Sequence, residues 1–469
     1  MKLTKYILIT LAISLLAMSC KIGPSYKRAD IVVAEKYRFT ADEDTIGTTE
    51  WWTLFNDSDL DTLVSYALDS SLDVLSMASR VEQARYNVGF TKADQWPKFG
   101  AQAGLTSGNY SQMRLPSESN SFSAGVNMAW EIDFWGKYRS LSDAAKAEYL
   151  ATEFGMRNLQ ISVITEVVRN YFLLLDYKAR LQIAEKTLES RKEYLNIIQQ
   201  RFDVGYAPEI DLNQAQMQTA IAEGAIPVYQ RFVAKAENAL SILIGKNPGP
   251  IISKSTIFEE KEPQTVPNGL PSELLERRPD ILQAEMNLMA QNERISAAIA
   301  MRFPSISLSG FLGGASDDLS TFVSDGLAWN VGAGLLGPIF NFNKNKRRVQ
   351  IEKAKTEQAL YQYRKTILVA FKEVEDALID IQTYEQEITS RQAHFDAASN
   401  AQDLSQQRYD KGVTSYLEVL ESQRQAFESE LNLSKTKQEF LNAYIKLYKS
   451  IGGGWLSEEE KKEAEESKK

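Results

Sequence analysis

The sequence predicts a mixed α/β membrane protein made of two internal repeats, each with two strands and long helices. Three observations predict this class. The chain resembles itself at a spacing of 207 residues, short segments alternate apolar and polar residues, and long proline-free segments show helical spacing of apolar residues.

Composition excludes several other classes of protein. The chain has 469 residues, of which 43% are hydrophobic and 25% charged, so it can form a large core but is too polar for a bundle of many transmembrane helices. Its formal net charge of −9 argues against a nucleic-acid partner, because no basic stripe is present to neutralise phosphates.

The N-terminus has the features of an export signal. Residues 1–19 combine a basic start, an apolar stretch and small residues, which predicts a signal peptide. Cys20 is the only cysteine, and Ser19-Cys20 is similar to a bacterial lipobox, whose cysteine is acylated with chains such as palmitate. Ala17 stands where such a box usually has leucine, and an ordinary signal peptide with an incidental cysteine is the alternative. We expect lipidation at Cys20 to anchor an N-terminal segment, residues 20–59, at a membrane surface.

The internal repeat covers most of the chain. "QRFDVG" starts at residue 200 and "QRYDKG" at residue 407, and the same shift superimposes "WPKF" on "FPSI". The alignment runs almost without gaps, which indicates a duplicated fold with repeats at 60–245 and 279–454. Residues 246–278 are rich in proline and glycine and predict a belt segment between the repeats, and the charged tail 455–469 predicts disorder.

Each repeat begins with a helix that stops before a proline, at about 60–95 and 281–301, and continues with two strands. In "SFSAGVNMAWEIDFWG" large apolar residues alternate with small or polar ones, as they also would in a soluble sandwich. A length of about 13 residues and the aromatic residues at the end favour a membrane strand, which needs about 9–11. Strands are expected near 98–110, 121–135, 304–314 and 328–342.

Two helices complete each repeat. Their apolar residues follow alternating three- and four-residue steps, which are typical of coiled-coil seams. Gly205 and Gly412 fall at the turns between the helices, where left-handed backbone is usually needed. The long helices are expected at 136–203 and 345–410, and the return helices at 209–245 and 415–450.

Four strands in one chain cannot close a membrane barrel. Single-chain barrels begin at eight strands, and each unpaired backbone group in lipid costs several kcal/mol. Membrane strands therefore require an oligomer, and a dimer with eight strands and a trimer with twelve both meet this requirement.

The segments "CKIGPSYKRAD", "LLERRPDILQAEMNLMAQNERISAAIAMRFPSISLSG" and "QRYDKGVTSYLEVLESQR" resemble the TolC family of outer-membrane efflux proteins, in its lipoprotein branch of the OprM and NodT type. The resemblance covers the mature chain to about Gly454, although Ala29 stands where the branch usually has proline. It implies a TolC-like fold: a homotrimer with a twelve-stranded β-barrel in the outer membrane that continues into a periplasmic α-helical barrel.

The resemblance also implies a function and partners. The protein would be the exit duct of a tripartite efflux pump, lipid-anchored in the outer membrane and extending into the periplasm. Its partners would be a periplasmic adaptor (membrane fusion) protein, an inner-membrane transporter of the RND type and outer-membrane lipid. Type I protein secretion is the alternative within the channel class, and a lipid-anchored coiled-coil envelope scaffold is the alternative from another class.

In the family, the helix turns at the periplasmic end contact the adaptor and form an iris that is shut at rest. The family closes this iris with an Asp and a Tyr linked to an Arg, and the matching positions are Asp211, Tyr409 and Thr414. Since threonine replaces arginine, Lys411 or Arg408 is expected to substitute, and simple packing is the alternative role for Tyr409. The matching adaptor-contact residues are Val204, Gly205, Tyr206, Ala207, Lys411, Gly412, Val413 and Thr414.

Glu418 and Glu421 match lumen-facing acidic residues of the family. In a trimer they would form carboxylate rings that favour cations at a constriction, whereas a solvated helix face is the alternative. The sequence shows no cysteine nucleophile, no glycine-rich phosphate loop and a single histidine, His394, in a polar helix. We therefore expect no enzymatic activity, no catalytic residues, no cofactor and no metal site.

Overall fold

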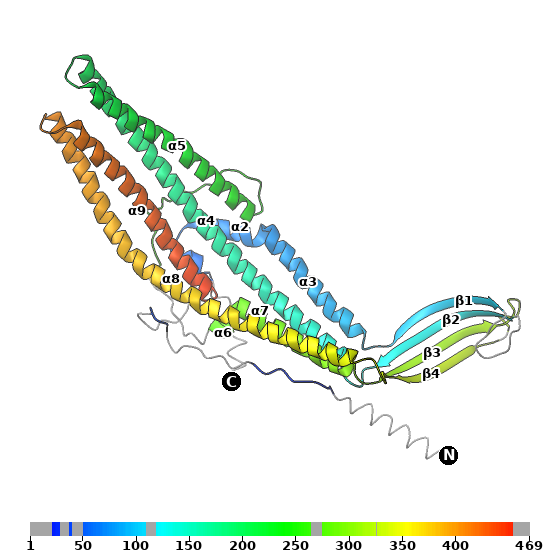
Figure 1. The fold of residues 1–469 in the computed structure, drawn as a ribbon. Helices are drawn as coiled ribbons and strands as arrows, with labels where there is room; N and C mark the ends of the chain where they lie inside the picture. Colours follow the sequence, from blue (N-terminus) through cyan, green and yellow to red (C-terminus); the bar gives the residue numbers. More distant parts are fainter. Residues whose placement is uncertain are drawn as a thin grey trace. The chain divides into compact units, whose positions relative to one another are not determined.

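A computed structural model describes residues 21–28, 37–39, 50–108, 119–263, 274–324 and 326–453. The chain divides into two compact units. The first comprises the described parts of 1–31, 80–153 and 283–365, and the second those of 32–79, 154–282 and 366–469. The elements, labelled in Figure 1, are η1 (Trp51–Phe55), α2 (Ser58–Ser70), α3 (Leu72–Ala93), β1 (Lys98–Gly108), β2 (Ser119–Ile132), α4 (Lys137–Asp203), α5 (Glu209–Leu243), α6 (Leu274–Arg277), α7 (Pro279–Ala300), β3 (Ser305–Ser316), β4 (Ala328–Leu336), α8 (Lys344–Asp410) and α9 (Tyr416–Ser450).

The first unit contains one antiparallel sheet with the strand order β1-β2-β3-β4. Each repeat supplies one hairpin, and β2 pairs with β3 to join the two hairpins. Among the described strands, β1 and β4 each pair on one side only. A single chain therefore carries two open edges.

Strand register places most of the large apolar residues of the four strands on one face, with Phe311 and Leu336 on the other. Val126 of β2 lies opposite Leu312 of β3, which lies opposite Trp329 of β4, and on the other side of β2 Phe122 lies opposite Leu105. A soluble sandwich would bury such a face against a second sheet. Here Val126, Leu312 and Trp329 are 50%, 53% and 71% exposed, as expected for side chains that meet lipid.

Two strands end before their predicted bounds, whereas β3, expected at 304–314, continues to Ser316. The strand expected at 328–342 ends at Leu336, because Pro338 cannot donate a ladder hydrogen bond. The strand expected at 121–135 ends at Ile132, because Asp133 turns to accept hydrogen bonds from Tyr138 N and Arg139 N at the start of α4.

The second unit contains the main hydrophobic core, in which the coiled-coil stripes of both repeats are buried. Val167 in α4 and its repeat counterpart Val374 in α8 are both fully buried in this core, together with Leu378. Ala184, a position of the α4 stripe, is also buried. The predicted helical seams are therefore confirmed, since the positions with coiled-coil spacing are buried or half-buried rather than exposed.

The helix expected at about 60–95 is two helices, α2 and α3, with a break at Ser71. Ser71 has extended backbone, and Ser70 O lies so close to Gly245 that a Cβ there would come within 2.2 Å of it. The end of α5 therefore abuts the break. This contact joins residues far apart in the sequence, so helical periodicity did not reveal it.

None of the described helices combines the length and apolar character needed to cross a bilayer.

Candidate functional site

The turn between α4 and α5 is built around Gly205, whose φ of 79° is left-handed. Gly205 N donates to Phe202 O at 2.9 Å and Tyr206 N to Arg201 O at 2.7 Å, so the last carbonyls of α4 are satisfied by the turn itself. Glycine adopts this backbone without strain because it has no Cβ.

The turn between α8 and α9 repeats this geometry. Gly412 has a φ of 71°, Gly412 N donates to Tyr409 O and Val413 N donates to Arg408 O, both at 2.9 Å. The expected left-handed glycines are therefore present at both turns, and Figure 1 shows each turn at the end of a helical hairpin.

The two turns present apolar side chains to solvent. Val204 and Val413 are each 66% exposed and Tyr206 is 87% exposed, whereas Ala207 is buried. Lys411 is exposed and, among the described residues, forms no ion pair. The surface of the turns therefore combines exposed apolar side chains with one cation, and the two turns differ in chemistry.

A small hydrophobic cluster lies beneath both turns and joins the two hairpins. Tyr409 packs partly buried against it, with its ring centroid 5.3 Å from that of Tyr416. Burial raises the pKa of the Tyr409 hydroxyl, and the neighbouring Arg201 opposes this shift. The buried members of the cluster are Ile198, Leu212, Ala215, Tyr416, Val419 and Leu420.

Arg201 connects the first hairpin to the second. Its Nη2 lies 3.1 Å from Asp410 Oδ1, and its guanidinium lies 5.1 Å from the centre of the Tyr409 ring. We did not single out Arg201 from the sequence. A signal was available, because Arg201 is the repeat counterpart of Arg408 within the six-residue motif.

Asp211 lies at the start of α5, where it is half-buried. Burial raises the pKa of its carboxyl, and its charge acts on Tyr409. Among the described residues it has no ion-pair partner. The expected Asp and Tyr therefore lie near one another, but the cation beside them is Arg201 rather than a residue at position 414.

Thr414, at the family's arginine position, donates from Oγ1 to a carboxylate oxygen of Glu418. Arg408 Nε lies 3.2 Å from Glu418 Oε1, so the substitute that we expected for the missing arginine does have a carboxylate partner. Lys411 does not take this role among the described residues. One turn of helix further, Glu421 lies 2.8 Å from Arg424, which lowers the pKa of the Glu421 carboxyl.

Each of the two expected acidic residues thus has a guanidinium partner within its own chain. Glu418 and Glu421 are therefore not a pair of free carboxylates. Exposed ion pairs of this kind contribute little to stability because water and salt screen them, so they can open readily.

Cys20 lies outside the described residues. The chain just after it is held against the first unit, where Lys21 Nζ lies 2.7 Å from both Asp143 and Glu293. Ile22 N also donates to Trp135 O, in the segment between β2 and α4. These contacts hold Lys21 and Ile22, the described residues that follow Cys20 in the sequence, at the junction between strands and helices.

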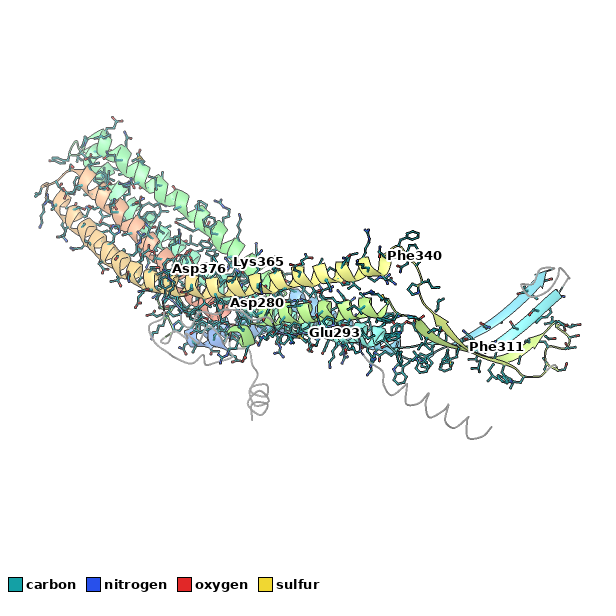
Figure 2. The ribbon with its side chains drawn as sticks, turned by 60° about the horizontal axis from the view of Figure 1, so that its bottom comes forward. Asp280, Glu293, Phe311, Phe340, Lys365 and Asp376 are labelled. Atoms are coloured by element: carbon teal, nitrogen blue, oxygen red, sulfur yellow. The ribbon has the colours of Figure 1, made fainter. Side chains whose placement is uncertain are left out.

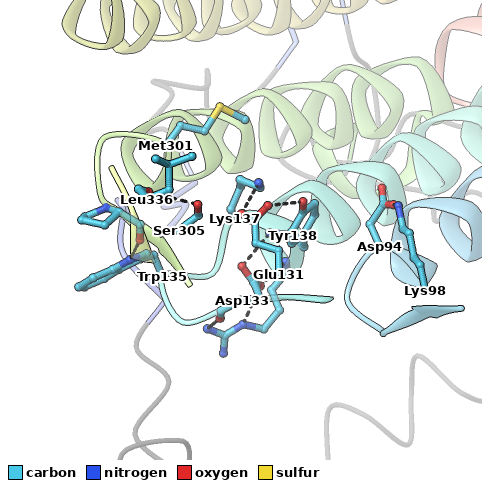
Figure 3. Close-up of polar contacts among 12 residues, drawn as sticks. Asp94, Lys98, Glu131, Asp133, Trp135, Lys137, Tyr138, Met301, Ser305 and Leu336 are labelled. Atoms are coloured by element: carbon cyan, nitrogen blue, oxygen red, sulfur yellow. Dashed lines mark hydrogen bonds and ion pairs between the residues drawn. The ribbon is translucent and has the colours of Figure 1, made fainter. Parts of the chain in front are cut away.

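That strand-to-helix junction contains a polar network, shown in Figure 3. Glu131 accepts from Lys137 Nζ at 2.6 Å and from the Tyr138 hydroxyl at 2.9 Å. Beside the network is a cavity of about 470 Å³, whose lining includes Glu131, Asp133, Lys137, Met301, Leu336 and Arg348.

Among the described residues, no group of three or more His, Cys, Asp and Glu side chains is arranged to hold a metal ion.

The sequence model of a family described as "Outer membrane efflux protein" matches residues 63–246 and 270–453. The two matches begin 207 residues apart, which is the spacing of the internal repeat. The chain belongs to the outer membrane efflux protein family, and each repeat carries the family pattern.

Named transport proteins are similar to nearly the whole chain. The solvent efflux pump outer membrane protein SrpC of Pseudomonas putida is 34% identical over 454 residues, which are 93% of this chain and 96% of SrpC. The probable outer membrane lipoprotein SilC of Salmonella typhimurium is 29% identical over 453 residues, which are 95% of this chain and 97% of SilC.

A solved structure of the CmeC outer membrane channel of Campylobacter jejuni has a TM-score of 0.86 and 26% identity, and it covers 96% of this chain and 98% of CmeC. These similarities confirm the resemblance to the TolC family and the predicted fold class. The chain is an outer-membrane efflux channel protein, and its relatives are transport proteins rather than enzymes.

Proposed function

We propose that three copies of this chain form the exit duct of a tripartite efflux pump. The observation that carries this proposal is the sheet of the first unit, which has an exposed apolar face and two open edges, β1 and β4. Open edges are costly in lipid, and three copies would pair β4 of one with β1 of the next into a closed twelve-stranded barrel. The helices would continue the barrel into the periplasm.

The turns between α4 and α5 and between α8 and α9 form the periplasmic gate and contact the adaptor. Their exposed Val204, Tyr206 and Val413 suit an apolar contact, and Lys411 adds a charge that can select the partner. Four residues around these turns hold the gate closed: Asp211, Tyr409, Glu418 and Glu421. An inner-membrane transporter of the RND type would deliver the cargo, and lipidation of Cys20 would anchor the duct to outer-membrane lipid.

The duct is tested with the purified mature protein. We expect a trimer that resists detergent and conducts poorly in planar bilayers, because its gate is shut. Replacing Glu418 and Glu421 with alanine is expected to raise conductance. A purified protein that is a monomer would contradict the proposal and favour the envelope scaffold. So would a protein that does not conduct even when E418A/E421A is combined with substitutions that loosen the turns.

The adaptor contact is tested by charge reversal. K411E is expected to reduce crosslinking to the adaptor and efflux by the cell, while the trimer still assembles. Lys235 is exposed on α5 away from the turns, so K235E is the matched control. Equal crosslinking in K411E and wild type would count against Lys411 as a contact. A deletion strain that loses secretion of a protein but keeps its resistance to small toxic compounds would favour type I secretion.

A further inference from the structure

The two strand-to-helix junctions of the first unit share one backbone geometry. Shifting by 207 residues superimposes Gly136 on Asn343 and Lys137 on Lys344. Gly136 has a φ of 76° and Asn343 a φ of 65°. At both junctions the chain therefore passes through left-handed backbone before the helix, α4 or α8, begins. The junctions can therefore be compared residue by residue.

Carboxylates neutralise the cations of the first junction. Lys137 Nζ lies 2.6 Å from Glu131 Oε1, and Arg139 Nε lies 3.4 Å from Asp133 Oδ2. Asp133 also accepts from the backbone N–H groups of Tyr138 and Arg139 at the start of α4, where the helix dipole favours negative charge. The positive charges of this junction are therefore neutralised by carboxylates of the same chain.

The second junction lacks those carboxylates and has more cations. Pro338 and Phe340 stand at the positions of Glu131 and Asp133, and no acidic residue lies in the first turn of α8. In their place α8 begins with four cations, none of which forms an ion pair with a described residue. Cations are disfavoured at a helix N-terminus, so an anion from outside the chain would relieve an electrostatic conflict. The four are Lys344, Lys346, Arg347 and Arg348.

Large apolar side chains flank these cations. Ile339, Phe340 and Phe342 are exposed, and the rings of Phe340 and Phe342 lie edge to face with centroids 4.6 Å apart. Figure 2 shows Phe340 at the start of α8. Exposed aromatic rings beside basic residues are typical of segments that lie at a membrane surface.

Of the four cations, Lys344 and Arg347 are the best placed to bind an anion together. They are three residues apart and share one side of α8, and both are exposed. Arg348 instead lines the 470 Å³ cavity, which also contains Glu131 and Asp133. An anion in that cavity would meet two carboxylates, so the cavity is the poorer location.

We propose that Lys344 and Arg347, with Ile339, Phe340 and Phe342, bind the phosphate headgroup of an anionic phospholipid. The inference rests on the proposed function, which places the strands in the bilayer and therefore this junction at headgroup level. Lysine and arginine donate to phosphate oxygens, and the apolar side chains insert among the acyl chains beneath them.

Native mass spectrometry of the full-length trimer, purified free of anionic lipid, tests this site. The probes are dioctanoyl phosphatidylglycerol and dioctanoyl phosphatidylcholine, which differ in headgroup charge. We expect the wild type to bind the glycerol lipid about tenfold more tightly than the choline lipid, and K344Q/R347Q to lose this preference. The preference should weaken with added salt.

Two further variants sharpen the result. K344R/R347K keeps both charges and is expected to keep the preference. R364Q/K365Q removes the same charge from exposed residues further along α8, where Figure 2 labels Lys365, and is also expected to keep it. Loss of the preference in R364Q/K365Q would mean that net charge alone attracts the lipid and would overturn the site.

Four other outcomes are informative. Equal binding of both lipids by the wild-type trimer would overturn the inference, as would an unchanged preference in K344Q/R347Q. If K344Q/R347Q kept the lipid preference but its trimer dissociated in detergent, the result would mean that Lys344 and Arg347 contact a second copy of the chain instead of a lipid. If the wild-type protein is a monomer before any lipid is added, the proposed function is contradicted. This result distinguishes failure of the proposed function from failure of the lipid site alone.

Discussion

Arg408 Nε lies 3.2 Å from Glu418 Oε1, so an ion pair joins the last turn of α8 to the first turn of α9. Thr414 donates to the same carboxylate from within the turn. The carboxylate therefore holds the turn from both of its sides, although position 414 lacks the arginine that the family uses.

Breaking this pair is expected to loosen the gate. The pair is exposed and contributes about 0.5 kcal/mol per subunit, so three copies lost together would change the ratio of open to closed channels about tenfold. E418Q should therefore conduct more than wild type in planar bilayers, with little change in thermal stability. The charge swap R408E/E418R restores the pair and should return conductance toward wild type. If the swap conducts as much as E418Q, the pair does not hold the gate.

Arg201 is expected to matter more to the gate than the Tyr409 hydroxyl. R201Q removes both the ion pair to Asp410 and the cation above the Tyr409 ring, whereas Y409F keeps the ring and its packing. Conductance should rise more in R201Q than in Y409F. R231Q, at an exposed position on α5, is the matched control and should behave as wild type. A larger effect of Y409F would show that the hydroxyl is the latch.

The two turn glycines are expected to tolerate no side chain, for conformational reasons alone. No atom lies within 4 Å of a Cβ built on Gly205 or Gly412, but both have left-handed φ. G205A and G412A should each cost about 1–2 kcal/mol and lower the Tm. Gly224 is equally uncrowded but lies within α5, so G224A should stabilise the protein by up to about 1 kcal/mol. Equal effects at the three positions would contradict this account.

Glu260 is expected to make stability depend on pH. It is buried, and burial together with the charge of Asp57 raises the pKa of its carboxyl from 4.5 to about 7. Between these two values the folded chain keeps a proton that the unfolded chain has lost. Stability from this group is therefore full below pH 4.5, falls as pH rises, and stays low above pH 7.

The variant E260Q is neutral at every pH and isolates this effect. At pH 8 the free energy of unfolding of E260Q should exceed that of wild type by on the order of 2 kcal/mol, and its thermal midpoint should be higher. At pH 5 the two proteins should have similar stability. E262Q, at an exposed position nearby, should show no such pH-dependent difference. A difference from wild type that is the same at both pH values would mean that Glu260 stays charged when folded.

Local patterns predicted the repeats, the long helices and both turns well. Periodicity and the positions of proline and glycine depend on neighbouring residues, and the same backbone preferences act in the folded chain. Thus Asp203 ends α4 and Asp410 ends α8, as the shared motif indicated, and Gly205 and Gly412 take the backbone that their positions required.

Contacts between distant residues were not predictable in this way. The break at Ser71 depends on the close approach of Gly245, and the partner of Arg201 is Asp410 on the other repeat. The early end of β4, in contrast, could have been predicted locally, because Pro338 marks it in the sequence. The predicted strand extends past Pro338 because the residues beyond it are apolar.

The sequence alone determined that this chain is a duplicated strand and helix protein of the efflux-channel family, because repeat spacing, alternation and helical period are properties of the chain itself. Tertiary structure decided which side chains pair. Glu418 meets Arg408 and Glu421 meets Arg424, so two residues that the sequence presents as free acids are neutralised. The reason is that charge at a site is a sum over neighbours in space, and folding chooses those neighbours.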